Sequence, residues 1–502
     1  MKIKLIKLIQ NELIKIFKRK SIYFLLILSA IVIVVYNNMN PDQNTIESFN
    51  SNTKSVPIDG MEAALENMKD NMEDYIRQKA SIDFWKLYNT FEEGSWQRYA
   101  LKEESAGHVV NNVYTDYNLD INMYLYNIND YEFDLNSQIS LETYNDSKIK
   151  YNEYIESLNS NNWKNFVNLK IKNLEERKSS ENLSASEIEE INFEIDIYQL
   201  RLNNNINFDY NIQNQYLEQY KTNYYNLQSI KLNSNAESQA YIDSNINQYK
   251  SKMSLCKYAI ENNIEYDISN ENNLIYDNKI DARISLIRTF KHFDLIIIII
   301  AIYISSTIIT EEINKKTIKS LLSKPHKRTT ILISKIIACI ITIIVSMIFI
   351  VIIQYFVGGC IFGFDSYNLD YIGYNYNNGQ IFTMSLLTYI LIVGLSKLNM
   401  YMMVIIFCIF IGTFNKNIAM SMILTLIIFL VGDTIIAEWS KVESLSVITR
   451  FFITNNWDFS IYLFGNTSDI SGVNLWHSII IYLIYFILLF KLSVNKFNKL
   501  EI

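Results

Sequence analysis

The chain has 502 residues, of which 49% are hydrophobic and 19% charged, with only 13 glycines and 3 prolines. Its net charge of −7 conceals two parts of opposite sign. Residues 37–291 carry 24 basic and 40 acidic side chains, whereas the rest of the chain carries 21 basic and 12 acidic ones. This segregation excludes a simple soluble enzyme, a disordered acidic protein and a collagen-like or disulfide-rich secreted fold. We interpret the chain as a basic, apolar membrane domain with an acidic, water-soluble domain inserted into it.

Residues 1–20 are predicted to form an amphipathic basic entry helix in the cytoplasm. Lys4, Lys7, Lys15 and Lys18 recur at helical spacing, and leucine, isoleucine and phenylalanine occupy the other face. Such a helix suits the inner leaflet of the membrane, although it can equally be a cytoplasmic extension of the first span. No small-residue cleavage site follows that span, so we expect an uncleaved membrane anchor.

Six apolar runs are expected to cross the membrane, which defines an all-α polytopic membrane protein. A helix needs about 20 residues to cross the hydrocarbon core. The third run contains Lys335 one turn inside its start, where the long side chain is expected to snorkel to the headgroups. The predicted spans are residues 21–36, 292–310, 331–358, 398–414, 418–431 and 478–490.

The distribution of positive charge predicts the orientation. Lysines and arginines gather before the first span, between the second and third and after the sixth, whereas the loop 359–382 has none. The positive-inside rule therefore places both termini in the cytoplasm and residues 37–291 outside the cell.

Two further apolar stretches are not counted as spans. Residues 381–397 are predicted to be an interfacial or re-entrant helix on the outer side, with a single tilted helix over 383–414 as the competing interpretation. Residues 437–476 are expected at the outer membrane surface. Residues 331–502 thus hold spans three to six, outer interfacial segments and a cytoplasmic C-terminus.

The inserted domain, residues 37–291, is predicted to be a mainly helical bundle or long hairpin. Ser184 and Glu187 form a capping-box pattern at the start of one helix. The helix that follows has a seam at spacings of three and four, which is typical of helices packed together. Tyrosines at 210–225 are interpreted as packing residues, with a ligand-stacking platform as the alternative. The seam residues are Ile188, Ile191, Ile195, Tyr198 and Leu202.

Motifs for catalysis are missing from the sequence. The chain has no Gly-Lys dipeptide and therefore no phosphate-binding G-x-x-x-x-G-K-[ST] loop, and it has neither H-E-x-x-H nor C-x-x-C. We predict no catalytic, cofactor-binding or metal-binding residue, and no nucleic-acid partner. The near absence of carboxylates inside the spans also disfavours an ion-coupled carrier.

Residues 311–330 are predicted to form a cytoplasmic coupling loop or short helix. An acidic pair is followed by a short run with apolar residues on one side and then by a proline, which together describe a compact knob that can dock on a soluble partner. A positive-inside loop without a partner is the plain alternative. The candidate coupling residues are Glu311, Glu312, Thr317, Ile318, Leu321, Leu322, Pro325 and Arg328.

This loop resembles that of the permease subunits of the ABC-2 family of ATP-binding-cassette transporters, whose pattern is E-x-x-x-G-T-[IL]-x-x-L-L-x-x-P-x-x-R-x-x-[IL]-x-x-[KR]. Lys316 departs from the family's glycine. Residues 11–20 and 497–502 are similar to the family's entry helix and C-terminal ending, and the resemblance covers 1–36 and 293–502. The matching residues are Glu312, Thr317, Ile318, Leu321, Leu322, Pro325, Arg328, Ile331 and Lys335.

The resemblance implies a permease driven by a separate cytoplasmic ABC ATPase subunit, with a second permease as homo- or heterodimer partner and membrane lipid around it. An Asn-, Ile- and Lys-rich composition suggests a bacterial cell membrane. The implied activity is export or clearance of an amphipathic substrate, such as a peptide, a lipid-linked compound or a drug. A membrane receptor whose outer domain binds a peptide or envelope ligand without transport is the alternative, and a structural anchor is a third interpretation.

Overall fold

The computed structural model describes residues 2–39, 54–66, 82, 84–102, 152–160, 162–180, 183–209, 211–233, 239–268, 281–315 and 327–499. The chain divides into two units. Unit 1 comprises Met1–Gln43, Thr222–Leu255 and Ile268–Ile502, and unit 2 comprises Asn44–Lys221 and Cys256–Asp267.

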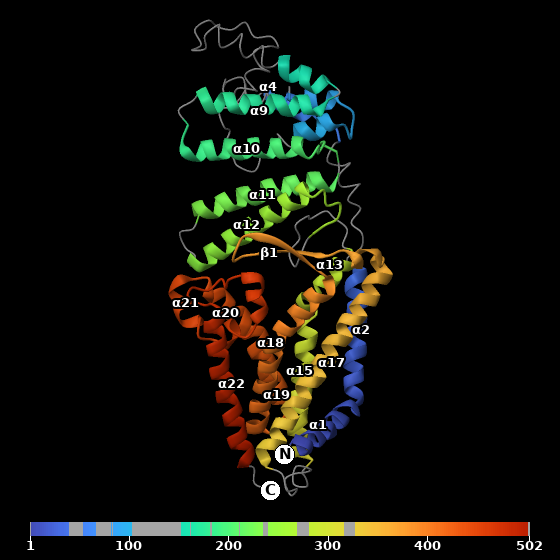
Figure 1. Cartoon of the computed structure of the whole chain (residues 1–502), viewed down its shortest axis with the longest axis vertical. Coiled ribbons are helices and arrows are strands. Elements are labelled where there is room, and N and C mark those ends of the chain that lie inside the picture. Colours follow the sequence, from blue (N-terminus) through green and yellow to red (C-terminus); the bar gives the residue numbers. More distant parts are fainter. Residues whose placement is uncertain are drawn as a thin grey trace. The chain divides into compact units, whose positions relative to one another are not determined.

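Unit 1 is a bundle of long apolar helices. Within the described part of the chain, six helices are long and apolar enough to cross a membrane. A short helix, α1 (Lys2–Phe17), precedes them, and both chain termini lie at the same end of the bundle (Figure 1). The six are α2 (Lys20–Met39), α15 (Asp294–Asn314), α17 (Arg328–Phe362), α18 (Leu386–Asn415), Ile418–Ser440 and α22 (Leu475–Asn498). Five of the six runs predicted as spans lie within these helices. The second, 292–310, starts two residues before α15.

The fifth span is not a uniform α-helix. It consists of α19 (Ile418–Leu426), a π-helical stretch η2 (Ile427–Gly432) and α20 (Asp433–Ser440). A π-helical stretch inserts an extra residue into the turn and leaves the ordinary hydrogen-bond ladder locally disrupted. The predicted end of this span at residue 431 therefore falls inside the π-helical stretch, and the helix continues for a further nine residues.

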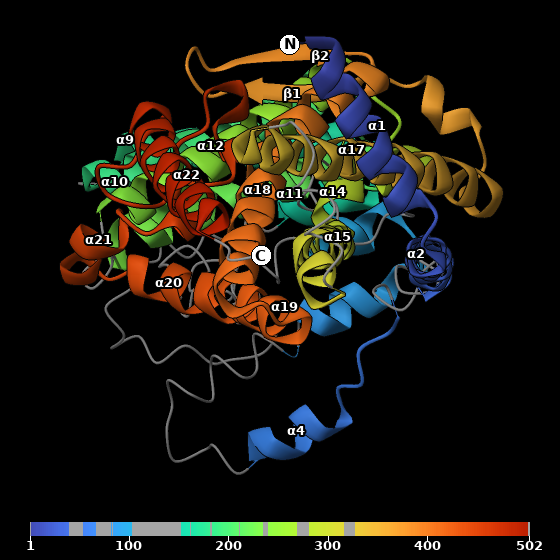
Figure 2. The ribbon, with the colours of Figure 1, turned by 90° about the horizontal axis from the view of Figure 1, so that it is seen from below.

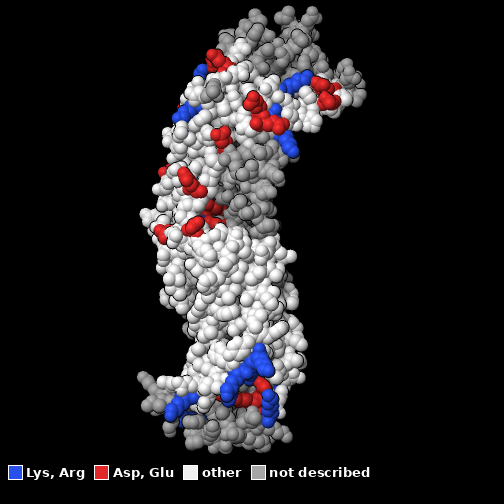
Figure 3. Space-filling model, turned by 90° about the vertical axis from the view of Figure 1, so that its right-hand side faces the viewer, with Lys and Arg blue, Asp and Glu red and all other residues white. Residues whose placement is uncertain are grey.

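The outer surface of the bundle is apolar. Large side chains such as Phe24, Leu391 and Ile484 are more than half exposed. Figure 3 shows an uncharged belt on one face of the span helices, with lysines and arginines gathered at the lower end, where Figure 1 places the termini. An exposed apolar belt of this kind would promote aggregation in water. It is the expected surface of a protein surrounded by lipid.

The most buried span is α15, which packs against α17, α18 and α19. It carries small polar side chains inside the bundle, and these donate to the helix's own backbone. Ser306 and Thr307, for example, both donate to the carbonyl of Tyr303, at 3.0 and 2.9 Å. Because both hydroxyls have an acceptor, burying them between helices does not carry the free-energy cost of an unpaired polar group.

The prediction of a separate interfacial or re-entrant helix over 381–397 is wrong. Residues 380–384 form a strand, and α18 continues without interruption from Leu386 to Asn415. Ser385 begins it by accepting a hydrogen bond from Thr388 N, and Lys416 ends it in the left-handed conformation at φ 55°. The competing interpretation, one long helix over 383–414, is close to the observed element.

A β-hairpin qualifies the all-α fold class. Strands β1 (Tyr371–Asn375) and β2 (Gln380–Met384) pair antiparallel, with Tyr374 opposite Ile381. Short helices also occur in the connections that the structure describes. They are α13 (Ala282–Ile287), α14 (Thr289–His292), α21 (Glu443–Thr449) and the 3₁₀ turns η1 (Asp365–Asn368), η3 (Ile453–Asn455) and η4 (Phe459–Gly465). The segment 437–476 is thus folded into short helices.

Unit 2 is built on helices, in agreement with the prediction for the inserted domain. Helices α9 (Trp163–Ser180) and α10 (Ala185–Asn203) lie side by side (Figure 1), and α4 (Asp59–Glu66) also belongs to this unit. A separate core gathers aromatic and aliphatic residues such as Tyr88, Phe166 and Phe208. Helices α11 (Ile212–Asn233) and α12 (Gln239–Glu261) cross the division between the units.

The local signals in this domain are confirmed. Ser184 and Glu187 form the reciprocal capping box, in which the Ser184 backbone N donates to Glu187 at 2.7 Å. Hydrogen bonds from Ser184 hold the pKa of Glu187 below its usual value. From the predicted seam, Ile191 and Ile195 pack on Leu174 of α9.

The described tyrosines of the 210–225 cluster include packing residues. Tyr216 is fully buried and donates to the carbonyl of Tyr266 at 2.6 Å, and the Tyr220 ring lies 5.4 Å from Phe193. Tyr210 lies outside the described residues.

Candidate functional site

Helix α1 carries a carboxylate on its buried face. Leu8, Glu12 and Ile16 are spaced four residues apart, so they lie on one side of the helix, and all three are buried. That side contacts α17, and Figure 2 shows α1 crossing α17 at this end of the bundle. A buried carboxylate in an apolar face requires a cation or hydrogen-bond donors close by.

The cation is Lys335 of α17. Its side chain is 0% exposed, and Nζ lies 2.9 Å from Glu12 Oε2 and 2.8 Å from Glu312 Oε2. It also donates to the carbonyl of Ile308 at 3.3 Å. The expectation that Lys335 snorkels to the headgroups is therefore wrong, because two carboxylates inside the bundle bind its ammonium group.

Lys15 completes the arrangement. Its Nζ lies 2.9 Å from Glu12 Oε1 and 2.7 Å from Glu312 Oε1. Glu12, Lys335, Glu312 and Lys15 thus alternate in a closed ring with two positive and two negative charges, which we call the ion ring. Burial alone lowers the pKa of Lys15, but the contacts with Glu312 and Glu12 outweigh it and raise the pKa above the usual value. The ion ring joins α1, α15 and α17.

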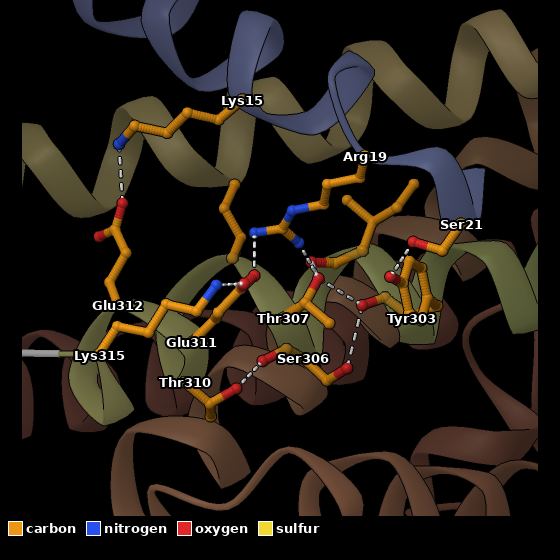
Figure 4. A network of polar contacts seen from close by, with 12 residues as sticks. Lys15, Arg19, Ser21, Tyr303, Ser306, Thr307, Thr310, Glu311, Glu312 and Lys315 are labelled. Atoms are coloured by element: carbon orange, nitrogen blue, oxygen red, sulfur yellow. Dashed lines mark hydrogen bonds and ion pairs between the residues drawn. The ribbon is translucent and has the colours of Figure 1, made fainter. Parts of the chain in front are cut away.

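A second set of polar contacts lies beside the ion ring (Figure 4). Glu311 pairs with Arg19 at 2.7 Å and with Lys315 one helical turn away on α15. Arg19 also donates to Thr307, and Ser21 contacts Tyr303. Arg19 lies in the connection between α1 and α2, and Ser21 is near the start of α2. These contacts therefore fix that connection and the start of α2 to α15.

The structure places three of the eight predicted coupling residues. Glu312 is in the ion ring, Glu311 is beside it, and Arg328 donates from the start of α17 to the carbonyl of Asn498 at 2.5 Å. Arg328 thereby joins the start of α17 to the end of α22. The other five lie outside the described residues: Thr317, Ile318, Leu321, Leu322 and Pro325.

Sequence reasoning missed the partners of Glu312. Glu12 and Lys335 were part of the family resemblance, but their pairing was not predicted, since 323 residues separate them. The available signal was Glu12 itself, a single carboxylate in the series Leu8, Glu12 and Ile16 that the helical period places on an apolar face. Such a residue predicts a buried cationic partner without identifying it.

The geometry defines a class: a multi-span helical membrane protein in which an ionic cluster holds the helices that flank the connection between its second and third spans. A comparison with protein families identifies the class further. The family model described as ABC-2 family transporter protein matches residues 6–501, and the chain belongs to this family. No curated protein and no solved structure matches the chain. The match supports a permease subunit of an ABC transporter, a membrane component without an ATPase of its own.

Proposed function

We propose that this permease exports or clears an amphipathic substrate, and that a separate ABC ATPase drives it by contacting residues 311–328. The observation that carries the proposal is the ion ring, which binds the start of that segment to α1 and α17. A force applied to residues after Glu312 acts on a joint held by buried ion pairs. Three helices would therefore respond to it together.

The proposed orientation places both termini and residues 311–330 in the cytoplasm and residues 37–291 outside a bacterial cell membrane. The support is the positive-inside rule, together with the basic residues at the end of the bundle that carries the termini. In this orientation α1 lies at the inner leaflet, where Ile6 and Ile14, both more than half exposed, can face lipid.

The proposed complex contains two permease subunits, identical or different, and two ATPase subunits. The inserted domain would move with the first two spans, since it is connected to both, and would handle or guard the substrate at the outer surface. Peptides, lipid-linked compounds and drugs are the candidate substrates.

Copurification tests the partner. A tagged chain, extracted from its native membrane in mild detergent, is expected to recover an ATPase with ATP-hydrolysing activity. Leu322→Asp, alone or with Glu312→Ala, is expected to abolish that recovery. Lys257→Met is the matched control, because Lys257 is an exposed lysine of the inserted domain whose ion pair, with Glu261, lies within its own helix. Normal recovery with Leu322→Asp would contradict the proposed contact.

Labelling of intact cells tests the orientation. In a background with Cys360, the exposed cysteine among the described residues, replaced by serine, a membrane-impermeant maleimide is expected to modify Lys257→Cys but not Lys315→Cys. Modification of Lys315→Cys from outside would reverse the orientation. A chain that never recovers an ATPase, but signals when a ligand binds its outer domain, would instead be the receptor.

A further inference from the structure

A second ion cluster, partly buried, lies at the other end of α15. Lys397 of α18 has its Nζ 2.8 Å from Asp294 Oδ2, at the start of α15, and 2.6 Å from Asp458 Oδ2, at the start of η4. The three side chains are only 14%, 18% and 16% exposed. Lys397 therefore joins three elements that are distant in sequence.

The two carboxylates are oriented by other donors. The hydroxyl of Tyr401, one turn after Lys397 on α18, donates to Asp294 Oδ1. Asp458 Oδ1 accepts from the backbone N and the hydroxyl of Ser460, at 2.9 and 2.6 Å. Each carboxylate thus directs its remaining oxygen at the lysine. The orientation of the two carboxylates is therefore fixed by contacts other than those with Lys397.

This cluster is a poor way to stabilise an apolar bundle. Two carboxylates share one ammonium, so a net negative charge remains in a partly buried place. Replacing buried ions with apolar groups of similar shape is often neutral or stabilising. Ionisable groups within spans are accordingly rare and are suspected of function by default. Stability alone therefore does not account for Lys397.

Helix α15 connects the two clusters. Asp294 is its first residue and Glu312 lies 18 residues later, which corresponds to about 27 Å along a helix. Ion pairs hold both ends, those of Glu312 to α1 and α17 and those of Asp294 to α18. Since α15 is continuous between them, an axial displacement at one end reaches the other.

Asp458 leads into a connection with many aromatic contacts. The preceding residue, Trp457, stacks on Phe429 of η2 with ring centroids 4.1 Å apart. At the end of η4, the Phe464 ring lies 4.8 Å from Phe382 of the β-hairpin, and its carbonyl accepts from Tyr376 N at 2.9 Å. A shift of Asp458 is therefore transmitted to the fifth span and to the hairpin.

We propose that Lys397 is a positioning residue that transmits displacement of α15 to α18 and to the segment 458–465. This inference rests on the proposed function, because the displacement originates where the ATPase acts, near Glu312. Lys397 would work as a latch: its ion pairs hold the segment 458–465 against α15 in the conformation described, and they break or re-form as α15 moves.

Hydrogen exchange on the copurified permease–ATPase complex tests the latch, with and without ATP plus orthovanadate. In the wild type, nucleotide is expected to change exchange both at residues 305–315 and at residues 456–466. Asp458→Asn removes the ion pair between Lys397 and the start of η4 and keeps the one with Asp294, so the fold is expected to persist. In this variant the change at 456–466 should fall at least threefold, while the change at 305–315 stays as in the wild type.

Three further variants sharpen the test. Lys397→Arg keeps the charge and should retain both responses. Asp294→Asn with Lys397→Met and Asp458→Asn removes every charge of the cluster, and should unfold at a temperature close to that of the wild type while losing the response at 456–466. Lys257→Met should change neither response.

The outcomes separate the two proposals. Two results would overturn the latch and leave the proposed function intact. One is a wild type in which nucleotide changes exchange at 305–315 but not at 456–466. The other is Asp458→Asn with the full wild-type change at 456–466. No response at either end in the wild type overturns the proposed function, and the latch with it.

Discussion

The ammonium of Lys335 lies 2.9 Å from the carboxylate of Glu12, although 323 residues separate them along the chain. Glu312 and Lys15 close the ring, and the four charges balance. Because Glu12, Glu312 and Lys335 each have an opposite charge on two sides, these three side chains tolerate a burial that none would tolerate alone.

Replacing Lys335 by methionine should destabilise unit 1. The change removes the ammonium that pairs with both Glu12 and Glu312, so we expect a loss of about 3 kcal/mol, the lower end of the range for breaking a buried pair. Equilibrium unfolding in mixed micelles measures it. The double variant Glu12→Gln with Lys335→Met leaves one carboxylate and one ammonium and should be more stable than Lys335→Met alone. A double variant that is less stable than the single one would contradict the ion ring.

Replacing Gln354 by leucine should disrupt a buried amide pair between α17 and α2. Gln354 Oε1 accepts from Asn37 at 3.1 Å and its Nε2 donates back at 3.2 Å, while Ser285 of α13 donates to Asn37 at 2.9 Å. The single change removes the acceptor of one Asn37 amide hydrogen and one of the two donors to its oxygen, which keeps Ser285. We expect a cost of about 1–3 kcal/mol.

Adding Asn37→Leu to Gln354→Leu removes both partners of that pair. The double variant should therefore lose clearly less stability than the sum of the single variants, as a double-mutant cycle by thermal unfolding can measure. Strict additivity would mean that the two amides do not interact.

Gly465→Ala should destabilise the connection after η4. Gly465 has φ +81°, and an added Cβ would lie 2.4 Å from the amide nitrogen of Asn377. Both effects oppose a side chain, so a loss of about 1–3 kcal/mol is expected. Gly60→Ala is the matched control, because Gly60 lies in α4 with nothing within 4 Å of its Cβ position, and it should be neutral or slightly stabilising. Equal thermal stability of both variants would refute this prediction.

The stability of unit 1 should depend on the protonation of His292, which lies just before α15. Burial, together with the charges of Arg288 and Lys291, lowers the pKa of His292 to about 4 from the usual value near 6.5. Folding therefore favours the neutral ring, and the unfolded chain binds more protons between these two values. The contribution of His292 is fully present above about pH 6.5 and is lost as the pH falls towards about 4.

The matched variant for this titration is His292→Phe, which keeps a ring against Tyr36, whose centroid lies 4.8 Å from that of the histidine. Thermal unfolding from pH 7.5 to 4 should show a smaller acid-induced loss in His292→Phe than in the wild type. Parallel pH profiles would show that His292 does not titrate as described.

Short-range information in the sequence was sufficient for the spans and for one helix start. An apolar run long enough to cross a membrane predicts a helix by itself, because the backbone in lipid must satisfy its hydrogen bonds within the helix. The capping box of Ser184 and Glu187 is equally local, since both donors and both acceptors lie within four residues. The family resemblance also depended on residues close together in sequence, and the family match extends it across residues 6–501.

The tertiary structure decided what the lysines inside apolar runs do. Residues 381–397 were predicted to be separate from the fourth span. Lys397 lies where that break was expected, yet Asp294 and Asp458 neutralise it and α18 continues through it. Lys335 was assigned to the headgroups, and Glu12 and Glu312 hold it inside the bundle. A hydropathy scale gives every lysine the free-energy cost of placing an isolated charge in the membrane. Whether that cost applies depends on carboxylates that only folding brings within 3 Å, and the most distant of them, Glu12, is 323 residues from Lys335 in the chain.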